Sequence, residues 1–212
     1  MADQSPRLKL YHATPSRSSV AMWMLEEIGE PYTLELLDLK RGDQRKPEYL
    51  ALNPMGKVPT LVDGDVVVSE VSAICCYLAD AYPKAGLAPA ISDPRRGQYL
   101  KWLFFAPSCV EPAMIDKALN RPAPQRGMSG WADYDTVIEV LRAATAKASP
   151  YILGDAFTAA DVVIGAGLNW GMQFKLLPTL DEFVAYTDNI KKRPALQRQI
   201  AKDEAFARQM SS

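Results

Sequence analysis

The chain has 212 residues, of which 48% are hydrophobic and 23% charged, and its formal net charge is −1. This length and composition suit one large domain or two small ones with a buried core. A net charge near zero gives no excess of positive charge that would attract nucleic acid or an anionic membrane. The N-terminal MADQSPRLKL lacks the apolar core of a signal peptide, and no apolar run reaches the roughly 18 residues of a membrane helix. The three cysteines, Cys75, Cys76 and Cys109, are odd in number, so we expect free thiols in a reducing cytoplasm.

The first part of the chain alternates strand and helix patterns. Residues 8–12 (LKLYH) predict a strand, and residues 17–28 predict a helix that stops at Gly29. Residues 32–38 alternate like a second strand, and PEYLALN predicts a short helical turn.

A hairpin follows these elements. Asp63-Gly64 stands between the runs TLV and VVV, and this dipeptide between β-branched runs is a strong two-residue turn signal. Residues 71–81 then predict a helix. The order is therefore β-α-β-α-β-β-α, which indicates an α/β domain.

The second part of the chain has only helical patterns. It begins after YPKAGLAPAISDPRRG (82–97), whose prolines and glycines indicate a linker. We therefore expect a first domain over 1–82, a linker over 83–97 and an all-helical domain over 98–212. The predicted helices cover 98–119, 131–148, 158–174, 180–192 and 195–207.

One of these helices has a clear start signal. FTAAD places Thr158 at the N-cap and Asp161 three residues later, which is a capping box. Phe157 and Val162 stand where a hydrophobic staple would pack. We interpret this motif as structural.

Pro59 and Glu70 are the two features of the hairpin region that suggest function. Pro59 removes an N–H at the first residue of a strand, which leaves Val58 extended with backbone groups free to pair with a peptide ligand. Glu70 precedes a helix whose N-terminal N–H groups attract a carboxylate. An ammonium beside Glu70 and a carboxylate at the helix start would together match the end of an α-amino acid. An ordinary turn proline and a simple helix cap are the alternatives.

Four stretches of the sequence carry a resemblance to a known family. They are YHATPSRSSVAMWMLEEIG, GDQRKPEYLALNPMGKVPTLVDGD, SEVSAICCYLAD and FTAADVVIG. In this order the chain resembles a cytosolic glutathione S-transferase, with a thioredoxin-like N-terminal domain that binds glutathione and an all-helical domain that forms the electrophile site. The resemblance implies a transferase that conjugates the glutathione thiolate to small electrophiles, without a metal, as a cytoplasmic homodimer.

The resemblance implies a set of glutathione contacts. Pro59 would be cis, Val58 would pair with the cysteinyl part, and Glu70 would hold the γ-glutamyl end. The glycyl carboxylate would be held by Gln44 and Arg45, and Lys57 matches another ligand-facing position. The family usually has serine directly after the carboxylate, but this chain has Val71 followed by Ser72. A hydrogen bond to a charged group contributes about 1.5–3 kcal/mol, so we expect weaker glutathione binding unless Ser72 compensates.

A free thiol has a pKa near 8.5, so a transferase must stabilise the thiolate with hydrogen bonds or positive charge. Ser16 aligns with the catalytic serine of theta- and phi-like members of the family, and a small register slip would favour Ser18 instead. Arg17 would add positive charge if it faces the site. Thr14 and Ser19 offer further hydroxyls, and the tyrosine mechanism of other classes would fall to Tyr11 or His12.

The electrophile pocket is expected to draw on both domains. KWLFFAPSCVEPAM places Trp102 and Phe105 on one helical face. Phe105, Ser108 and Met114 are candidate pocket residues, and His12 is another, although core packing also explains such a stripe. Two other functions stay open: a glutathione-dependent lyase, isomerase or peroxidase, and a non-catalytic binding or scaffold module.

Overall fold

The computed structural model describes residues 6–123, 125 and 127–211 of the chain. These residues form two compact units. The first unit contains residues 6–85 together with 194–211, and the second unit contains residues 86–193. The C-terminal segment therefore folds with the N-terminal part, whereas the sequence patterns grouped it with the helical half.

A four-stranded mixed sheet forms the centre of the first unit. Its strands are β1 (Leu8–His12), β2 (Tyr32–Leu36), β3 (Thr60–Asp63) and β4 (Val66–Ser69), in the order β2-β1-β3-β4. β1 runs parallel to β2 and antiparallel to β3, and β3 runs antiparallel to β4. Both the α/β class of this unit and its thioredoxin-like element order were predicted, and both are confirmed.

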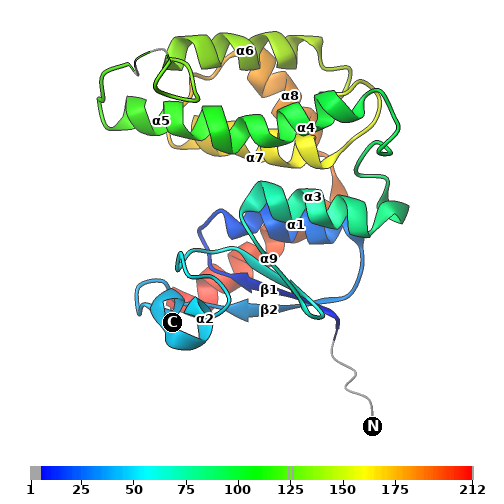
Figure 1. Cartoon of the computed structure of the whole chain (residues 1–212), viewed down its shortest axis with the longest axis vertical. Helices are drawn as coiled ribbons and strands as arrows, with labels where there is room; N and C mark the ends of the chain where they lie inside the picture. Colours follow the sequence, from blue (N-terminus) through cyan, green and yellow to red (C-terminus); the bar gives the residue numbers. More distant parts are fainter. Residues whose placement is uncertain (1–5, 124, 126, 212) are drawn as a thin grey trace. The chain divides into compact units, whose positions relative to one another are not determined.

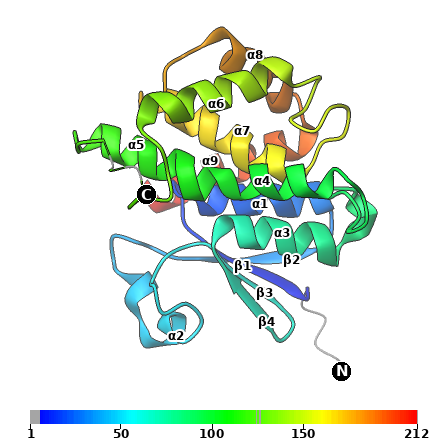
Figure 2. The same cartoon turned by 45° about the horizontal axis from the view of Figure 1, so that its top comes forward.

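Two helices cover one face of this sheet. Figures 1 and 2 show α1 (Ser18–Ile28) and α3 (Val71–Ala81) side by side over the strands, with α2 (Pro47–Leu50) on the other side. The short 3₁₀ turns η1 (Asp43–Arg45) and η2 (Pro83–Ala85) complete the unit apart from its last helix. Gly29 ends α1 with φ of 76°, as its position predicted.

The hairpin between β3 and β4 turns one residue later than expected. Asp63 stays in the ladder opposite Val66, so Gly64 and Asp65 form the turn. The Asp63 carboxylate is buried and accepts hydrogen bonds from Arg7, Tyr77 and Tyr82. These bonds hold Asp63 inside the sheet, and Gly64, with φ of 58°, takes the left-handed position.

The last helix, α9 (Pro194–Ser211), packs against α1. The buried carboxylate of Glu26 on α1 accepts hydrogen bonds from Arg198 Nε at 2.7 Å, Lys202 Nζ at 2.5 Å and Tyr32 Oη at 2.5 Å. Burial alone would raise the pKa of Glu26, but the hydrogen bonds from Lys202, Tyr32 and Arg198 outweigh it and lower the pKa. Glu26 therefore fastens the C-terminal helix to the first unit.

The second unit consists of helices. They are α4 (Arg96–Phe105), the π-helical turn η3 (Ala106–Val110), α5 (Glu111–Ala118), α6 (Tyr134–Lys147), α7 (Ala159–Gln173) and α8 (Asp181–Lys191). α7 packs against α4 and α8, and most of its residues are buried (Figure 2). Gly165 lets α8 approach, because a Cβ at this residue would lie 2.6 Å from Cδ1 of Ile190.

The prediction of a single helix over 98–119 is wrong. Two helices joined by a π-helical turn occupy this region. Pro107 lies in this turn, where its missing N–H and its ring are incompatible with a regular α-helix. Pro107 therefore accounts for the break between the two helices, and the apolar periodicity of the sequence does not reveal this break.

The start of α7 agrees with its prediction. Thr158 N and Thr158 Oγ1 donate to Asp161 Oδ2 at 2.9 and 3.0 Å, and the capping box is formed. Asp161 Oδ1 also accepts from Ile152 N and from Tyr186 Oη, both at 2.8 Å. The motif is therefore a structural centre of the second unit.

Candidate functional site

The strand register brings most of the predicted site segments to one end of the sheet in the first unit. His12 lies opposite Leu36, Tyr11 lies opposite Thr60, and Thr60 lies opposite Ser69. The loop after β1, the segment after β2, the residues before β3 and the residue after β4 therefore all leave the sheet at this end. These segments carry the predicted glutathione and catalytic residues of the first domain.

Buried side chains hold the backbone at Val58. The Val58–Pro59 peptide bond is cis, as expected. The carbonyl of Lys57, the residue before Val58, accepts hydrogen bonds from Tyr49 Oη at 2.5 Å and Asn53 Nδ2 at 2.8 Å. Burial raises the pKa of Tyr49, so this group acts as a neutral donor. Tyr49 and Asn53 were not predicted as site residues, although the turn-forming NPMG pattern marks their loop.

Glu70 has an unusual backbone. Its φ is 70° and its ψ is 123°, a conformation that costs a non-glycine residue about 1–3 kcal/mol and that is concentrated at functional sites. The side chain is exposed and makes no capping hydrogen bond to α3. A simple cap therefore does not explain this carboxylate. Val71 is half-buried in the first turn of α3, and Ser72 is buried.

The loop between β1 and α1 contains a pair of serine hydroxyls. Ser16 is half-buried, and its Oγ lies 2.6 Å from Oγ of Ser18. The backbone N–H of Ser18 also donates to Ser16 Oγ, at 3.1 Å. Ser18 is fully buried, with its Oγ 3.1 Å from Ala13 N and 3.0 Å from Ala13 O. The expectation that Ser18 acts on a ligand directly is thus corrected: Ser16 is the accessible hydroxyl, and Ser18 orients it.

The hydrogen bonds continue from Ser18 into the interior. Ser18 Oγ lies 2.8 Å from His12 Nδ1, and His12 Nε2 lies 2.8 Å from Asp203 Oδ1 on α9. The other carboxylate oxygen of Asp203 accepts from Ser19 Oγ at 2.5 Å and Gln199 Nε2 at 2.6 Å. His12 is fully buried, so the expectation that it lines the electrophile pocket is wrong. No local sequence signal connects His12 with Asp203, which lies 191 residues away.

The predicted contacts for the glycyl carboxylate lie in and near η1. Gln44 Nε2 donates to the carbonyl of Leu39 at 3.3 Å, and among the described residues its buried Oε1 has no hydrogen-bond partner. Arg45 and Lys57 are exposed. Gly56 has φ of 59°, and a Cβ there would lie 3.1 Å from the Gln44 carbonyl oxygen, so the two loops are in close contact. Arg17, at the start of α1, is exposed.

The candidate electrophile residues of the second unit lie in different environments. Phe105 is half-buried and its ring packs edge-on against Trp102, with centroids 5.5 Å apart. Ser108 is exposed in the π-helical turn. The Met114 side chain is buried in the core, which corrects its assignment as an open pocket residue.

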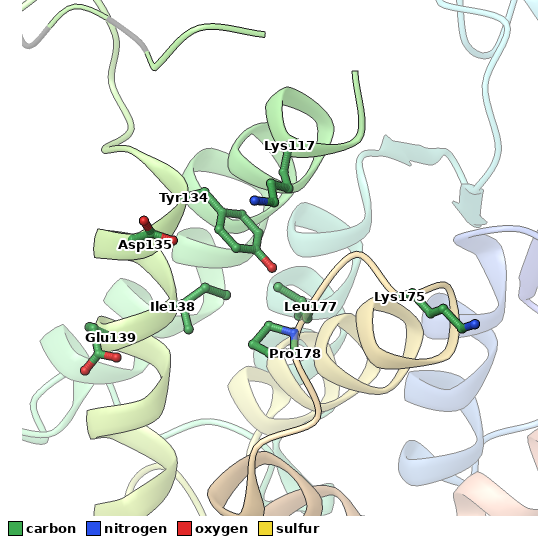
Figure 3. Close-up of a pocket in the computed structure, with 8 residues that line it drawn as sticks. All are labelled: Lys117, Tyr134, Asp135, Ile138, Glu139, Lys175, Leu177 and Pro178. Atoms are coloured by element: carbon green, nitrogen blue, oxygen red, sulfur yellow. The ribbon is translucent and has the colours of Figure 1, made fainter. Parts of the chain in front are cut away.

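A hollow of about 520 Å³ lies elsewhere in the second unit. Figure 3 shows the ring of Tyr134 extending from α6 toward the loop that carries Leu177 and Pro178. Tyr134 Oη donates to the Leu176 carbonyl at 2.9 Å, and Lys117 Nζ lies 5.2 Å from the centre of the Tyr134 ring. None of the residues predicted for the electrophile pocket lines this hollow. Its lining consists of Lys117, Tyr134, Asp135, Ile138, Glu139, Lys175, Leu177 and Pro178.

Known proteins resemble this chain over most of its length. The family model of the glutathione S-transferase N-terminal domain matches residues 16–81. Glutathione S-transferase F10 of Arabidopsis thaliana is 33% identical over 167 residues, which cover 73% of this chain and 76% of that protein. The chain belongs to the glutathione S-transferase family. The family membership inferred from the quoted motifs is therefore confirmed.

Solved structures of the family have the same fold. A glutathione transferase from Methylococcus capsulatus str. Bath has a TM-score of 0.77 and 25% identity, over 93% of this chain and 99% of that one. A sphingomonad glutathione S-transferase, solved in complex with glutathione, has a TM-score of 0.76 and 26% identity, over 92% and 98% of the two chains. The fold of this family member is therefore a thioredoxin-like domain followed by a helical domain.

The described residues contain neither a membrane-spanning helix nor a metal-binding cluster. Within residues 6–123, 125 and 127–211, no helix combines the length and apolarity that a membrane span requires. In the same residues, no group of three or more His, Cys, Asp or Glu side chains is arranged to hold a metal ion. Cys75, Cys76 and Cys109 form no disulfide, and burial raises the pKa of Cys75 and Cys109.

Proposed function

We propose that this chain binds glutathione at the end of the sheet in the first unit and transfers it, as a thiolate, to a small electrophile. The observation that carries the proposal is the half-buried Ser16 hydroxyl, held by Ser18 at the sheet end where Val58–Pro59 and Glu70 also lie. Three groups form one binding surface for glutathione. The backbone at Val58 pairs with the peptide, the Glu70 carboxylate receives the ammonium group, and the Ser16 hydroxyl faces the thiol.

Each predicted residue has a role in this proposal. The Val58 backbone pairs with the cysteinyl part, Glu70 receives the ammonium group, and the N–H groups of the first turn of α3 receive the γ-glutamyl carboxylate. Ser16 donates to the sulfur, and Arg17 with the α1 N-terminus adds positive potential. Gln44, Arg45 and Lys57 hold the glycyl end, and Phe105 and Ser108 contact the electrophile.

Calorimetry with millimolar glutathione tests the binding part. We expect wild-type protein to bind, and Glu70→Ala to bind more weakly because the ligand ammonium loses its partner.

A non-catalytic binding module is the second candidate, favoured by Val71 in the position of the usual serine. Glutathione binding without any conjugation of an aryl halide would support that candidate. Absence of binding would refute a glutathione site altogether.

The pH profile of conjugation tests the role of Ser16. A charge-assisted hydrogen bond contributes about 1.5–3 kcal/mol, which corresponds to about 1–2 pKa units on the thiol. Ser16→Ala should therefore lower turnover at neutral pH more than at high pH, with little change in glutathione affinity. Thr14→Ala is the matched hydroxyl control in the same loop. A profile shifted by Thr14→Ala but not by Ser16→Ala would contradict the assignment.

We further infer a cytoplasmic homodimer from the family resemblance. Size-exclusion chromatography with light scattering measures the assembly directly, and a mass of one chain at micromolar concentration would contradict the dimer.

A further inference from the structure

A continuous chain of hydrogen bonds runs from the accessible Ser16 hydroxyl to the half-buried carboxylate of Asp203 in the first unit. Ser16 Oγ is 2.6 Å from Ser18 Oγ, Ser18 Oγ is 2.8 Å from His12 Nδ1, and His12 Nε2 is 2.8 Å from Asp203 Oδ1. Ser18 and His12 are fully buried. We call this set, Ser16–Ser18–His12–Asp203, the inner chain.

We propose that the inner chain is a proton relay in which His12 takes up the thiol proton of bound glutathione. This inference rests on the proposed function, because Ser16 must face the sulfur. His12, Ser18 and Asp203 touch no substrate and act through Ser16, so they are positioning residues. Imidazole suits this role because it is the side chain that most readily changes charge near neutral pH.

In the proposed resting state Asp203 is ionised and the His12 ring is neutral. An ionised Asp203 only accepts, so His12 Nε2 carries a proton and, in the neutral ring, Nδ1 is an acceptor. In this state Ser18 donates its one proton to Nδ1 rather than to the Ala13 carbonyl, which lies 3.0 Å away, and it accepts from Ala13 N and from the Ser16 hydroxyl. Ser16 accepts from Ser18 N and keeps one lone pair for an incoming S–H. In this state the Ser16 proton points inward and cannot stabilise a thiolate.

Transfer of one proton along the chain reverses every hydrogen bond in it. The thiol proton passes to Ser16 Oγ, the Ser16 proton passes to Ser18 Oγ, and the Ser18 proton passes to His12 Nδ1. The S–H bond breaks and an N–H bond forms, so the products are a thiolate and an imidazolium with no proton released. Ser16 now donates to the thiolate, Ser18 donates to Ser16, and His12 donates to both Ser18 and Asp203. Every donor again has an acceptor.

Side chains from α1 and α9 surround His12. Asp203 is held by Ser19, Gln199 and His12, so the carboxylate is fixed beside the ring. Phe206, whose ring centroid is 5.9 Å from that of His12, fills another side. The carboxylate of Glu26 is engaged by Arg198 and Lys202. Besides Arg198, the exposed charged residues on β1, β2 and α9 and just before α1 are Lys9, Glu35, Glu204, Arg208 and Arg17.

The protonation state of the histidine tests the relay directly. His12 is the only histidine of the chain, so its ring-nitrogen NMR signals are unambiguous. We expect a neutral ring with the proton on Nε2 in the free protein at pH 7.5, and an imidazolium when glutathione is bound. S-methylglutathione has no thiol proton and is the matched control, so it should leave the ring neutral. A ring that stays neutral while ultraviolet absorbance shows the bound thiolate would overturn the proposal.

Asp203→Asn gives a second test with a kinetic readout. Loss of a charge beside an ionisable group shifts its equilibrium by about one pKa unit or more. We therefore expect conjugation at neutral pH to fall at least about tenfold, with recovery at high pH and an unchanged KM for glutathione. Asp188→Asn on α8, an exposed aspartate paired with Lys191, is the matched control and should keep the wild-type profile. An unshifted profile in Asp203→Asn would refute the relay.

The two proposals fail in different ways. If wild-type protein binds no glutathione, the proposed function falls, and the relay falls with it. If the protein binds and conjugates glutathione but His12 stays neutral in the complex, only the relay falls. Because the NMR measurement uses the wild-type chain, it is decisive even if Asp203→Asn lowers the stability of the first unit.

Discussion

Glu26 offers the sharpest test of how the C-terminal helix is held to the first unit. Glu26→Gln removes the charge that Arg198 and Lys202 share, and keeps an acceptor for Tyr32. Each hydrogen bond to a charged group contributes about 1.5–3 kcal/mol. The Arg198 and Lys202 side chains are 53% and 42% exposed, so solvent screening reduces this contribution. We therefore expect the free energy of unfolding of the first unit to fall by about 2 kcal/mol.

The pH dependence of this effect follows from the lowered pKa of Glu26. A carboxyl group whose folded-state pKa is depressed stabilises the fold above its unfolded value, about 4.3, and loses this contribution as pH falls through the folded pKa. The difference between wild type and Glu26→Gln should therefore be constant near neutral pH and shrink in acid. Hydrogen exchange of α1 and α9 peptides isolates the first unit, which a global unfolding curve of a two-unit protein does not.

A matched control separates the effect of the Glu26 contacts with Arg198 and Lys202 from a general effect of removing charge. Glu139→Gln on α6 removes a carboxylate that is 68% exposed and lies 3.7 Å from Arg142. Such a surface pair contributes less than about 1 kcal/mol, so this variant should match wild type. Unchanged exchange of α9 in Glu26→Gln would refute the reasoning, and so would a loss of protection that persists undiminished in acid.

Three further predictions concern other parts of the chain. Asp161→Ala should destabilise the second unit by about 3 kcal/mol, because four hydrogen-bond donors lose their acceptor; thermal unfolding measures this loss, and a change below about 1 kcal/mol would contradict it. Val71→Ser should tighten glutathione binding by up to about tenfold in calorimetry, whereas an unchanged affinity would mean that Ser72 or the backbone already satisfies the ligand. Gly165→Ala should cost about 1–3 kcal/mol in urea unfolding, and Ile190→Val, which removes the clashing Cδ1, should restore most of it; additive losses would refute this contact.

Much of the fold follows from patterns that neighbouring residues carry. The alternation of LKLYH matches β1 residue for residue, and Thr158 with Asp161 forms the capping box that its spacing predicts. Gly29 likewise ends α1 as its position predicts. Helix periods, caps and turn residues act within a few positions of one another, so sequence alone reveals them. The four motifs quoted from the sequence also indicated the family correctly.

The composition of the site was decided by tertiary packing. The sequence indicated several hydroxyls after β1, but only the structure shows that Ser18 is buried and Ser16 accessible. The sequence made His12 one candidate for the electrophile pocket, whereas α9 covers His12 and supplies Asp203, 191 residues away. Whether a polar side chain faces a ligand or the core depends on which distant element packs over it. Here the packing of α9 against α1 decides which polar side chains are buried. No local sequence pattern encodes that packing.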